Sequence, residues 1–179
     1  MKLVTPCAEY IDSYRALIRE FAGRGEPLVP HSLSMANEPT QEFLDLVAAQ
    51  SRGERLPEGF VPATMYWLVE DGEVVGVADL RHRLTDHLRR EGGNIGYGIR
   101  PSRRGRGLAT ALLAQTLVKA RELGLTEALV TCAKTNIASA RTILKNGGVF
   151  LSEEYIEQRG EIVQRYRIDL QCELCSPRD

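Results

Sequence analysis

The sequence predicts an α/β protein in which helices flank one mixed, mostly antiparallel central sheet. In the first third of the chain, apolar residues recur every three or four positions, as on one face of a helix. From residue 63 onward, short apolar runs typical of strands alternate with two further helical patterns. The 179 residues are 43% hydrophobic and 26% charged, as in an ordinary globular domain. No composition shift marks a boundary, so we expect residues 1–179 to form one domain, with a disordered tail from about residue 171.

The expected elements run in the order ααββ(β)αβαββ. The first helix covers residues 10–21 and ends near Gly23, and proline-containing loops flank a shorter helix around residues 43–47. Asp71-Gly72 indicates a hairpin, and Gly124 is placed to end a long helix. The later helices are expected at residues 106–123 and 136–146, and the strands at residues 65–69, 74–80 continuing to 84, 95–100, 128–132, 149–156 and 162–170.

Net charge, the start of the chain and the cysteine spacing argue against several classes of protein. The net charge of −1 provides no overall field that would attract nucleic acid or an anionic membrane. The start of the chain lacks the pattern of a signal peptide, so we expect a cytoplasmic location. Cys172 and Cys175 form a single C-x-x-C without the second pair of ligands that a structural zinc site requires. We therefore expect no metal.

The segment from Gly98 to Thr110 is the one most informative about chemistry. It places a turn rich in glycine and arginine between a short strand and the start of a long helix. Free N–H groups and a partial positive charge make a helix start a natural anion site. From Asp79 to Arg106 there are eight arginines and three acidic residues, a local excess of 8 − 3 = +5. This combination predicts a site for a small polyanion.

Several known anion sites do not fit this turn. A P-loop requires a Gly-Lys pair, which the sequence lacks. A dinucleotide-binding fingerprint requires a third glycine where Thr110 stands. An RNA-binding arginine patch remains an alternative, although RNA modules normally add exposed aromatic residues and these are only 6% of the chain.

Arg104, Gly107 and Ala109 form an R-x-x-G-x-A pattern that resembles the pyrophosphate-binding signature of the GNAT superfamily of acetyl-CoA-dependent N-acetyltransferases. The helix from Asn136 to Gly148 resembles that family's N-x-x-[AS]…K-x-G motif, and the order of elements agrees over residues 3–170. The resemblance implies the acyl-CoA N-acyltransferase-like fold and acetyl-CoA as cosubstrate. It also implies direct attack on acetyl-CoA by the amine of a small molecule or peptide, in a ternary complex.

The resemblance also implies the residues that bind the cosubstrate. The main chain of Ile99 would pair with the pantetheine arm, and Arg100 would meet the 3′-phosphate. Asn136 would hydrogen-bond the pantetheine beside Ser139, and its position also fits a helix N-cap. Main-chain N–H groups of one continuous run would hold the pyrophosphate: Arg104, Gly105, Arg106, Gly107, Leu108, Ala109 and Thr110.

The usual acid and base of the family cannot be carried over, because Ile143 and Asn94 stand where a Tyr and a Glu are common. A CoA thiol, with a pKa near ~8.5, leaves readily, whereas an amine with a pKa of ~10.4 is mostly protonated at pH 7. A base is therefore the greater need. A main-chain N–H near Ile99 or Arg100 would polarise the thioester. Base candidates are His82, His87 and Glu91, and acid candidates are Tyr97 and Tyr155.

The missing acid and base leave a non-catalytic acyl-CoA-binding module as an alternative to an enzyme. The acceptor pocket is expected from residues 20–62 and 81–93, whose sequence does not identify the amine. Nucleic acid and membrane are not expected partners. The edge formed by the last strands could pair in a homodimer.

Overall fold

The computed structural model describes residues 1–35 and 38–171. The tail that was expected to be disordered, which includes Cys172 and Cys175, lies outside these residues. Each predicted helix and strand is present in the predicted order. The helices are α1 (Ile11–Gly23), α2 (Gln41–Ser51), α3 (Leu108–Glu122) and α4 (Ile137–Lys145). The strands are β1 (Lys2–Val4), β2 (Ala63–Glu70), β3 (Glu73–Arg81), β4 (Ile95–Ile99), β5 (Glu127–Ala133), β6 (Val149–Ile156) and β7 (Glu161–Asp169).

The strands form two antiparallel sheets, with the orders β1-β2-β3-β4 and β5-β7-β6, rather than the single sheet that the sequence predicts. The two sheets meet where β4 and β5 begin to diverge. There the N–H of Asn94 donates to the Leu129 carbonyl at 2.6 Å. The N–H of Leu129 donates to Oδ1 of Asn94 at 2.9 Å. Beyond this junction, no strand among the described residues pairs with the main chain of β4 on the side of β5.

Two strand boundaries differ from the prediction. The strand β1 was not predicted, since three residues are too few to show a period of two; it pairs with β2 at Leu3 and Leu68. The strand β3 ends at Arg81 and does not continue to residue 84. Its partner β4 begins at Ile95, opposite Leu80, so no strand among the described residues pairs with the chain after Arg81 on that side.

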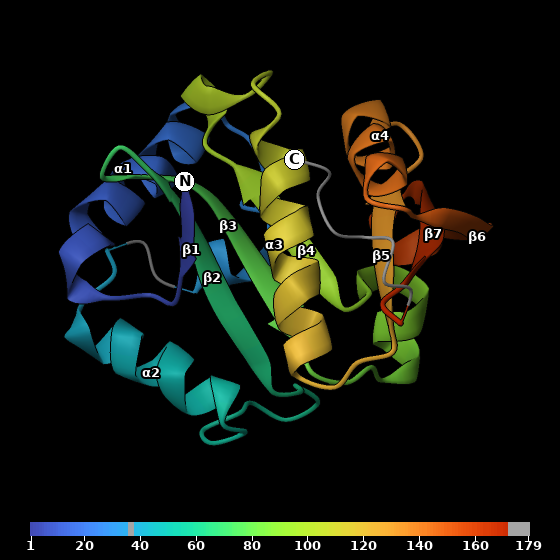
Figure 1. Ribbon diagram of the computed structural model, residues 1–179, viewed down its shortest axis with the longest axis horizontal. Coiled ribbons are helices and arrows are strands. Elements are labelled where there is room, and N and C mark those ends of the chain that lie inside the picture. The colour runs from blue at the N-terminus through green and yellow to red at the C-terminus, as the bar shows by residue number, and fades with distance from the viewer. Residues whose placement is uncertain (36–37, 172–179) are drawn as a thin grey trace.

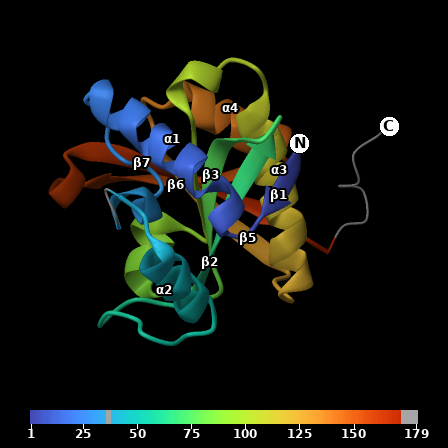
Figure 2. The same cartoon turned by 90° about the vertical axis from the view of Figure 1, so that its left-hand side faces the viewer.

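Helices cover both faces of the four-stranded sheet, with α1 and α2 on one face and α3 on the other (Figure 1, Figure 2). Alternate residues of β2 serve the two faces: Trp67 packs beneath α1, and Leu68 belongs to the core beneath α3. The ring of Trp67 stacks on Tyr14 with their centroids 4.5 Å apart. This alternation inside an apolar run is typical of a strand buried on both faces. No helix in the described ranges is both long enough and apolar enough to cross a membrane.

Candidate active site

The turn between β4 and α3 has the backbone geometry of an anion site. Gly105 and Gly107 have φ values of +79° and +78°, which glycine adopts without steric cost. Gly107 is the N-cap of α3, and its side-chain position faces open space. Within the described residues, the N–H groups of Gly105, Arg106 and Gly107 donate no hydrogen bond. The N–H of Thr110, by contrast, already donates to the Gly107 carbonyl at 3.0 Å.

This turn opens into a groove of about 960 Å³ between the diverging strands β4 and β5, with α4 on its far side. All but two of the residues proposed to bind the cosubstrate line it. The exceptions are Arg100, whose side chain is only 13% exposed and pairs with Glu20 at 2.6 Å, and Arg106, which pairs with Glu70 at 3.1 Å. The lining residues are Ile99, Arg104, Gly105, Gly107, Leu108, Ala109, Thr110, Asn136 and Ser139.

Polar groups of α4 and β4 meet in this groove. Oδ1 of Asn136 caps α4 by accepting from the Ser139 N–H at 3.0 Å, so the N-cap interpretation is confirmed. The Tyr97 hydroxyl lies 2.9 Å from Oγ of Ser139. Burial raises the pKa of Tyr97 to about 12, although its hydrogen bond to Ser139 lowers it. The phenol is therefore protonated at neutral pH.

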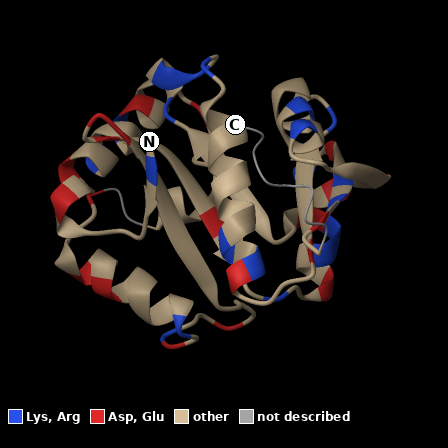
Figure 3. Cartoon of the chain, viewed as in Figure 1, with Lys and Arg blue, Asp and Glu red and all other residues tan. Residues whose placement is uncertain are grey.

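The arginines of the turn are paired with glutamates from the first half of the chain. Arg104 pairs with Glu26 at 2.6 Å, and Arg103 pairs with Glu73. Figure 3 shows blue segments before α3 close to red segments of α1 and of the β2–β3 hairpin, at the top of the view. The local charge of +5 that the sequence indicates is thus largely neutralised, because it counts neighbours along the chain and omits those brought close by folding.

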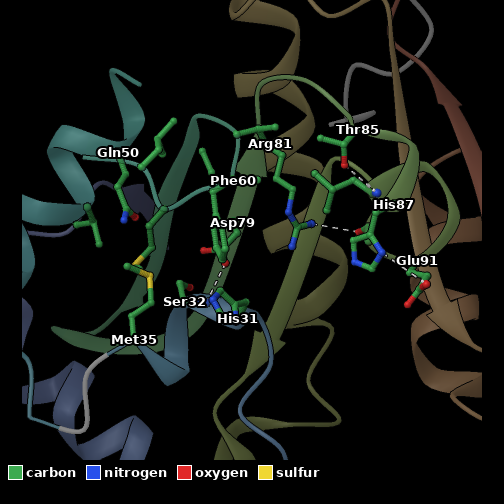
Figure 4. A pocket seen from close by; sticks show the side chains of 18 of the residues that line it. His31, Ser32, Met35, Gln50, Phe60, Asp79, Arg81, Thr85, His87 and Glu91 are labelled. Atoms are coloured by element: carbon green, nitrogen blue, oxygen red, sulfur yellow. Dashed lines mark hydrogen bonds and ion pairs between the residues drawn. The ribbon is translucent and has the colours of Figure 1, made fainter. Parts of the chain in front are cut away.

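A second cavity of about 580 Å³ lies beside the groove (Figure 4). Apolar side chains form much of its wall, including Met35, Phe60 and Leu88. Its lining falls mostly in the two segments expected to build the acceptor pocket, with added residues from β2 and β3 and with Arg159. The residues that line both this cavity and the groove are His31, Arg81, Glu91, Gly92 and Arg159.

A glycine of β4 allows the chain to reach this second cavity. A Cβ atom at Gly98 would collide with the Val29 carbonyl oxygen, so the segment before His31 can cross β4 only where a side chain is missing. The following turn, His31–Ser34, then lies against β3. There the Ser32 N–H donates to Oδ2 of Asp79 at 3.1 Å.

The base candidates lie in different places. Glu91 lines both cavities with a side chain only 12% exposed, and its Oε1 is 3.6 Å from Nδ1 of His87. His82 lines neither of the two cavities. Its Nε2 lies 2.8 Å from Oγ1 of Thr64, and burial lowers its pKa. Tyr155 is exposed on β6, on a different sheet from Tyr97.

Asp79 and His31 both line the second cavity, although neither was predicted as a site residue. Asp79 is 7% exposed, and burial raises its pKa. A carboxylate within the apolar run Val74–Leu80 was a usable signal, since an ionised group is costly to bury. His31 follows a proline in a loop without periodicity, and nothing in the sequence singles it out.

Metal ligands do not gather in the described ranges: no three His, Cys, Asp or Glu side chains are placed to hold an ion. The Cys172–Cys175 pair lies outside those ranges.

The family model described as "Acetyltransferase (GNAT) domain" matches residues 12–149. The chain belongs to the GNAT acetyltransferase family. A search of curated proteins finds no significant match. The chain also shares its fold with solved structures of low sequence identity. An N-acetyltransferase from Staphylococcus aureus Mu50 is 18% identical, with a TM-score of 0.63 over 94% of this chain and 98% of that one.

Two further structures share the fold of this GNAT protein. The yncA protein of Salmonella typhimurium, solved with its cofactor acetyl-CoA, is 18% identical with a TM-score of 0.62, covering 99% of this chain and 97% of that one. A mutant of the spermidine N-acetyltransferase SpeG from Vibrio cholerae is 16% identical, with a TM-score of 0.61 and 96% of each chain covered.

The two positions at which this GNAT protein departs from the common acid and base are structural. Ile143 is fully buried in the core against α3 and β5, so it faces away from the groove. Asn94 is 5% exposed and joins the two sheets through Leu129. Its Nδ2 also donates to the Arg81 carbonyl at 3.3 Å.

Proposed function

We propose that this GNAT acetyltransferase binds acetyl-CoA in the groove and an amine in the adjoining cavity, and that the amine attacks directly in a ternary complex. The observation that carries the proposal is the shared wall of the two spaces, which includes Glu91 and Arg81. Volumes of about 960 and 580 Å³ suit a nucleotide cosubstrate and a small acceptor. The acetyl-CoA bound to the Salmonella structure of the same fold supports this assignment.

The turn before α3 is proposed to hold the pyrophosphate through main-chain N–H groups of residues 104–109, which glycine geometry leaves open. The free side of β4 near Ile99 would pair with the pantetheine arm as an added strand. Arg100 and Arg106 are occupied by glutamates, so the 3′-phosphate contact requires Arg100 to leave Glu20.

Bound acetyl-CoA supplies the acetyl group as a thioester; the exchange forms an amide C–N bond and breaks the C–S bond. The ammonium nitrogen loses two protons, of which one is released and the other balances the proton that the CoA sulfur gains. Glu91, at the junction of the two cavities, is proposed to take that proton directly or through water. Tyr97 is proposed to protonate the departing sulfur and to regain its proton from the amine nitrogen, which loses its second proton at this step. The phenol therefore ends protonated, as its raised pKa of about 12 favours. A main-chain N–H near Ile99 or Arg100 would polarise the carbonyl. We assign no role to His82 in this proposal, because it lines neither cavity.

Calorimetric titration with acetyl-CoA tests the groove. Gly107→Val should abolish binding, because the added side chain projects into the open space proposed for the phosphates. Gly124→Val is the matched control: Gly124 also has a positive φ, +84°, and open surroundings, but follows the other end of α3. Equal losses of affinity in the two variants would contradict the assignment.

CoA release with a panel of amines separates the enzyme from a non-catalytic acyl-CoA-binding module. Family membership favours the enzyme, and we expect turnover. Binding without turnover over a broad panel would instead favour the module.

We further propose a homodimer through β6, an edge strand with exposed Phe150, Leu151 and Tyr155. Light scattering should give twice the chain mass, and Phe150→Glu should reduce it to one. A single-chain mass for the unaltered protein would refute the dimer. A cytoplasmic location remains a prediction.

A further inference from the structure

Two oppositely charged side chains in the acceptor cavity do not form an ion pair with each other. Asp79 and Arg81 are two residues apart on β3, so they lie on the same face of the strand, and both line the cavity. In the described part of the chain, neither has an oppositely charged partner within 4.0 Å. In Figure 4 the Asp79 carboxylate lies next to Phe60 and Ser32, and the guanidinium of Arg81 lies on the side of His87.

Each of these groups keeps hydrogen-bonding capacity free. Asp79 accepts one hydrogen bond, from the Ser32 N–H to Oδ2. Arg81 uses only Nη1, which donates to the carbonyls of Gly92 at 3.1 Å and Gly93 at 3.0 Å. Nothing in the described residues bonds Oδ1 of Asp79, or Nε and Nη2 of Arg81. Unpaired charges in a buried site are costly, so their retention indicates a ligand that pairs with both.

A buried hydroxyl beside Asp79 points to the same ligand site. Ser32 is 4% exposed and lines the cavity, yet its Oγ has no hydrogen-bond partner within 3.5 Å among the described residues, although it is near enough to the Asp79 carboxylate to lower the pKa of that group. A buried hydroxyl without a partner is uncommon and requires an explanation. The other titratable groups near Asp79 are His31 and Tyr14, besides Arg81 itself. Neither is within the range of an ion pair or a hydrogen bond to it.

We propose that the acceptor is a zwitterionic α-amino acid with an apolar side chain. The inference rests on the proposed function. Its ammonium would meet Asp79 and Oγ of Ser32, and its carboxylate would meet Arg81. The side chain would lie against Met35 and Phe60, with the remaining apolar wall around it.

The spacing and charge suit this head group better than other amines. Residues i and i+2 of a strand are about 6.6 Å apart, a span that an amine and a carboxylate on one carbon can bridge together. A simple amine would leave Arg81 unpaired, and the second cation of a diamine would meet Arg81 with the same charge. Asp79 is opposite Gly96 of β4, so an amine held there lies beside the strand that borders the groove.

A matched set of three acceptors tests the proposal: L-phenylalanine, L-phenylalaninamide and 2-phenylethylamine, with L-leucine and L-methionine as further side chains. We expect kcat/KM for CoA release to be about 10- to 100-fold higher for the acid than for its amide or the amine, as for a lost hydrogen bond between charged groups. Arg81→Gln should remove this preference by slowing the acid alone, and Arg81→Lys should restore part of it. Arg121→Gln, an exposed residue of α3 that lines neither cavity, should change nothing.

The panel with the unaltered protein does not depend on the folding of any variant. Equal rates for acid, amide and amine, or no turnover of the three amino acids, would overturn the proposal. So would an Arg81→Gln effect of equal size on all three phenylalanine analogues. If calorimetry shows acetyl-CoA binding in those cases, the proposed function stands and only the acceptor is wrong. A lack of acetyl-CoA binding would refute the proposed function itself.

Discussion

At the scale of single residues, Asp79 is a carboxylate within an apolar strand and only 7% of it is exposed. Burial raises its pKa above the ordinary 3.8, even though the Ser32 hydroxyl, the Ser32 N–H and the charges of Arg81 and His31 lower it. Below its ordinary pKa the group is protonated both folded and unfolded. As pH rises above that range, the unfolded chain loses this proton first. Asp79 therefore lowers the free energy of unfolding increasingly, up to its pKa in the folded state.

We expect Asp79→Asn to raise the melting temperature at pH 7, because the amide has the same shape, keeps an acceptor for the Ser32 N–H and carries no charge. The gain should shrink as pH falls toward 4, where the carboxyl of the unaltered protein is also protonated. Thermal melts of both proteins from pH 4 to 8 measure this difference, and other titrating groups largely cancel. A gain independent of pH, or a loss at pH 7, would contradict a raised pKa. Turnover should fall at the same time.

The residues of the site were predictable to different degrees. The signature at Arg104, Gly107 and Ala109 is local, since one turn and one helix start determine it, and these residues line the groove. The second cavity depends on segments far apart in the chain. No local spacing reveals that His31 and Asp79 meet there. The direction in which a side chain points could not be predicted either. Arg100 follows the signature strand, but its side chain points to Glu20.

At the scale of elements, one side chain joins the two sheets. Asn94 receives the N–H of Leu129 and donates to the Arg81 carbonyl, so it bridges β3 and β5 at the start of β4. The strands diverge immediately after this bridge, and the groove begins there. The position where the family commonly has a carboxylate thus stabilises the junction of the sheets.

Asn94→Ala should lower the free energy of unfolding by about 1–3 kcal/mol, because it leaves the Leu129 N–H without its acceptor in a buried site. The melting temperature should fall by about 2–10 °C in a domain of this size. Gln164→Ala, which removes an amide from the half-buried face of β7, is the control and should cost less. If the two variants melt alike, Asn94 does not stabilise the junction.

Most elements were predictable from apolar periodicity and from turn residues, as for α3 between Gly107 and Gly124. The division into two sheets could not be predicted from such local patterns. The point at which the sheets meet depends on contacts between residues 35 positions apart, such as Asn94 and Leu129. The short strand β1 was missed for the same reason. It exists through its pairing with β2 rather than through its own pattern.

At the scale of the whole molecule, folding redistributes the charge that the sequence concentrates in one segment. Glutamates of α1, of the loop after it and of the β2–β3 hairpin pair with the arginines that precede α3. The arginines that precede α3 are therefore already paired before binding, and they would contribute only after leaving their partners. Arg141 and Lys145 of α4 also line the groove, and neither forms an ion pair with the described residues. Binding would therefore depend on these two cations and on main-chain N–H groups.

Glu26→Gln should tighten acetyl-CoA binding by about 2- to 5-fold, a change of the size expected for one exposed ion pair. Glu26 lines the groove and holds Arg104 at 2.6 Å, so removing its charge both frees that guanidinium and removes a repulsive carboxylate. Glu54→Gln breaks the exposed pair with Arg52 and changes the net charge equally, so it controls for long-range effects. Calorimetry at low and high salt measures both variants, and the advantage of Glu26→Gln should shrink as salt screens the phosphates. Equal affinities for the two variants at low salt would mean that Arg104 does not reach the cosubstrate, leaving the main chain of the turn to hold the pyrophosphate.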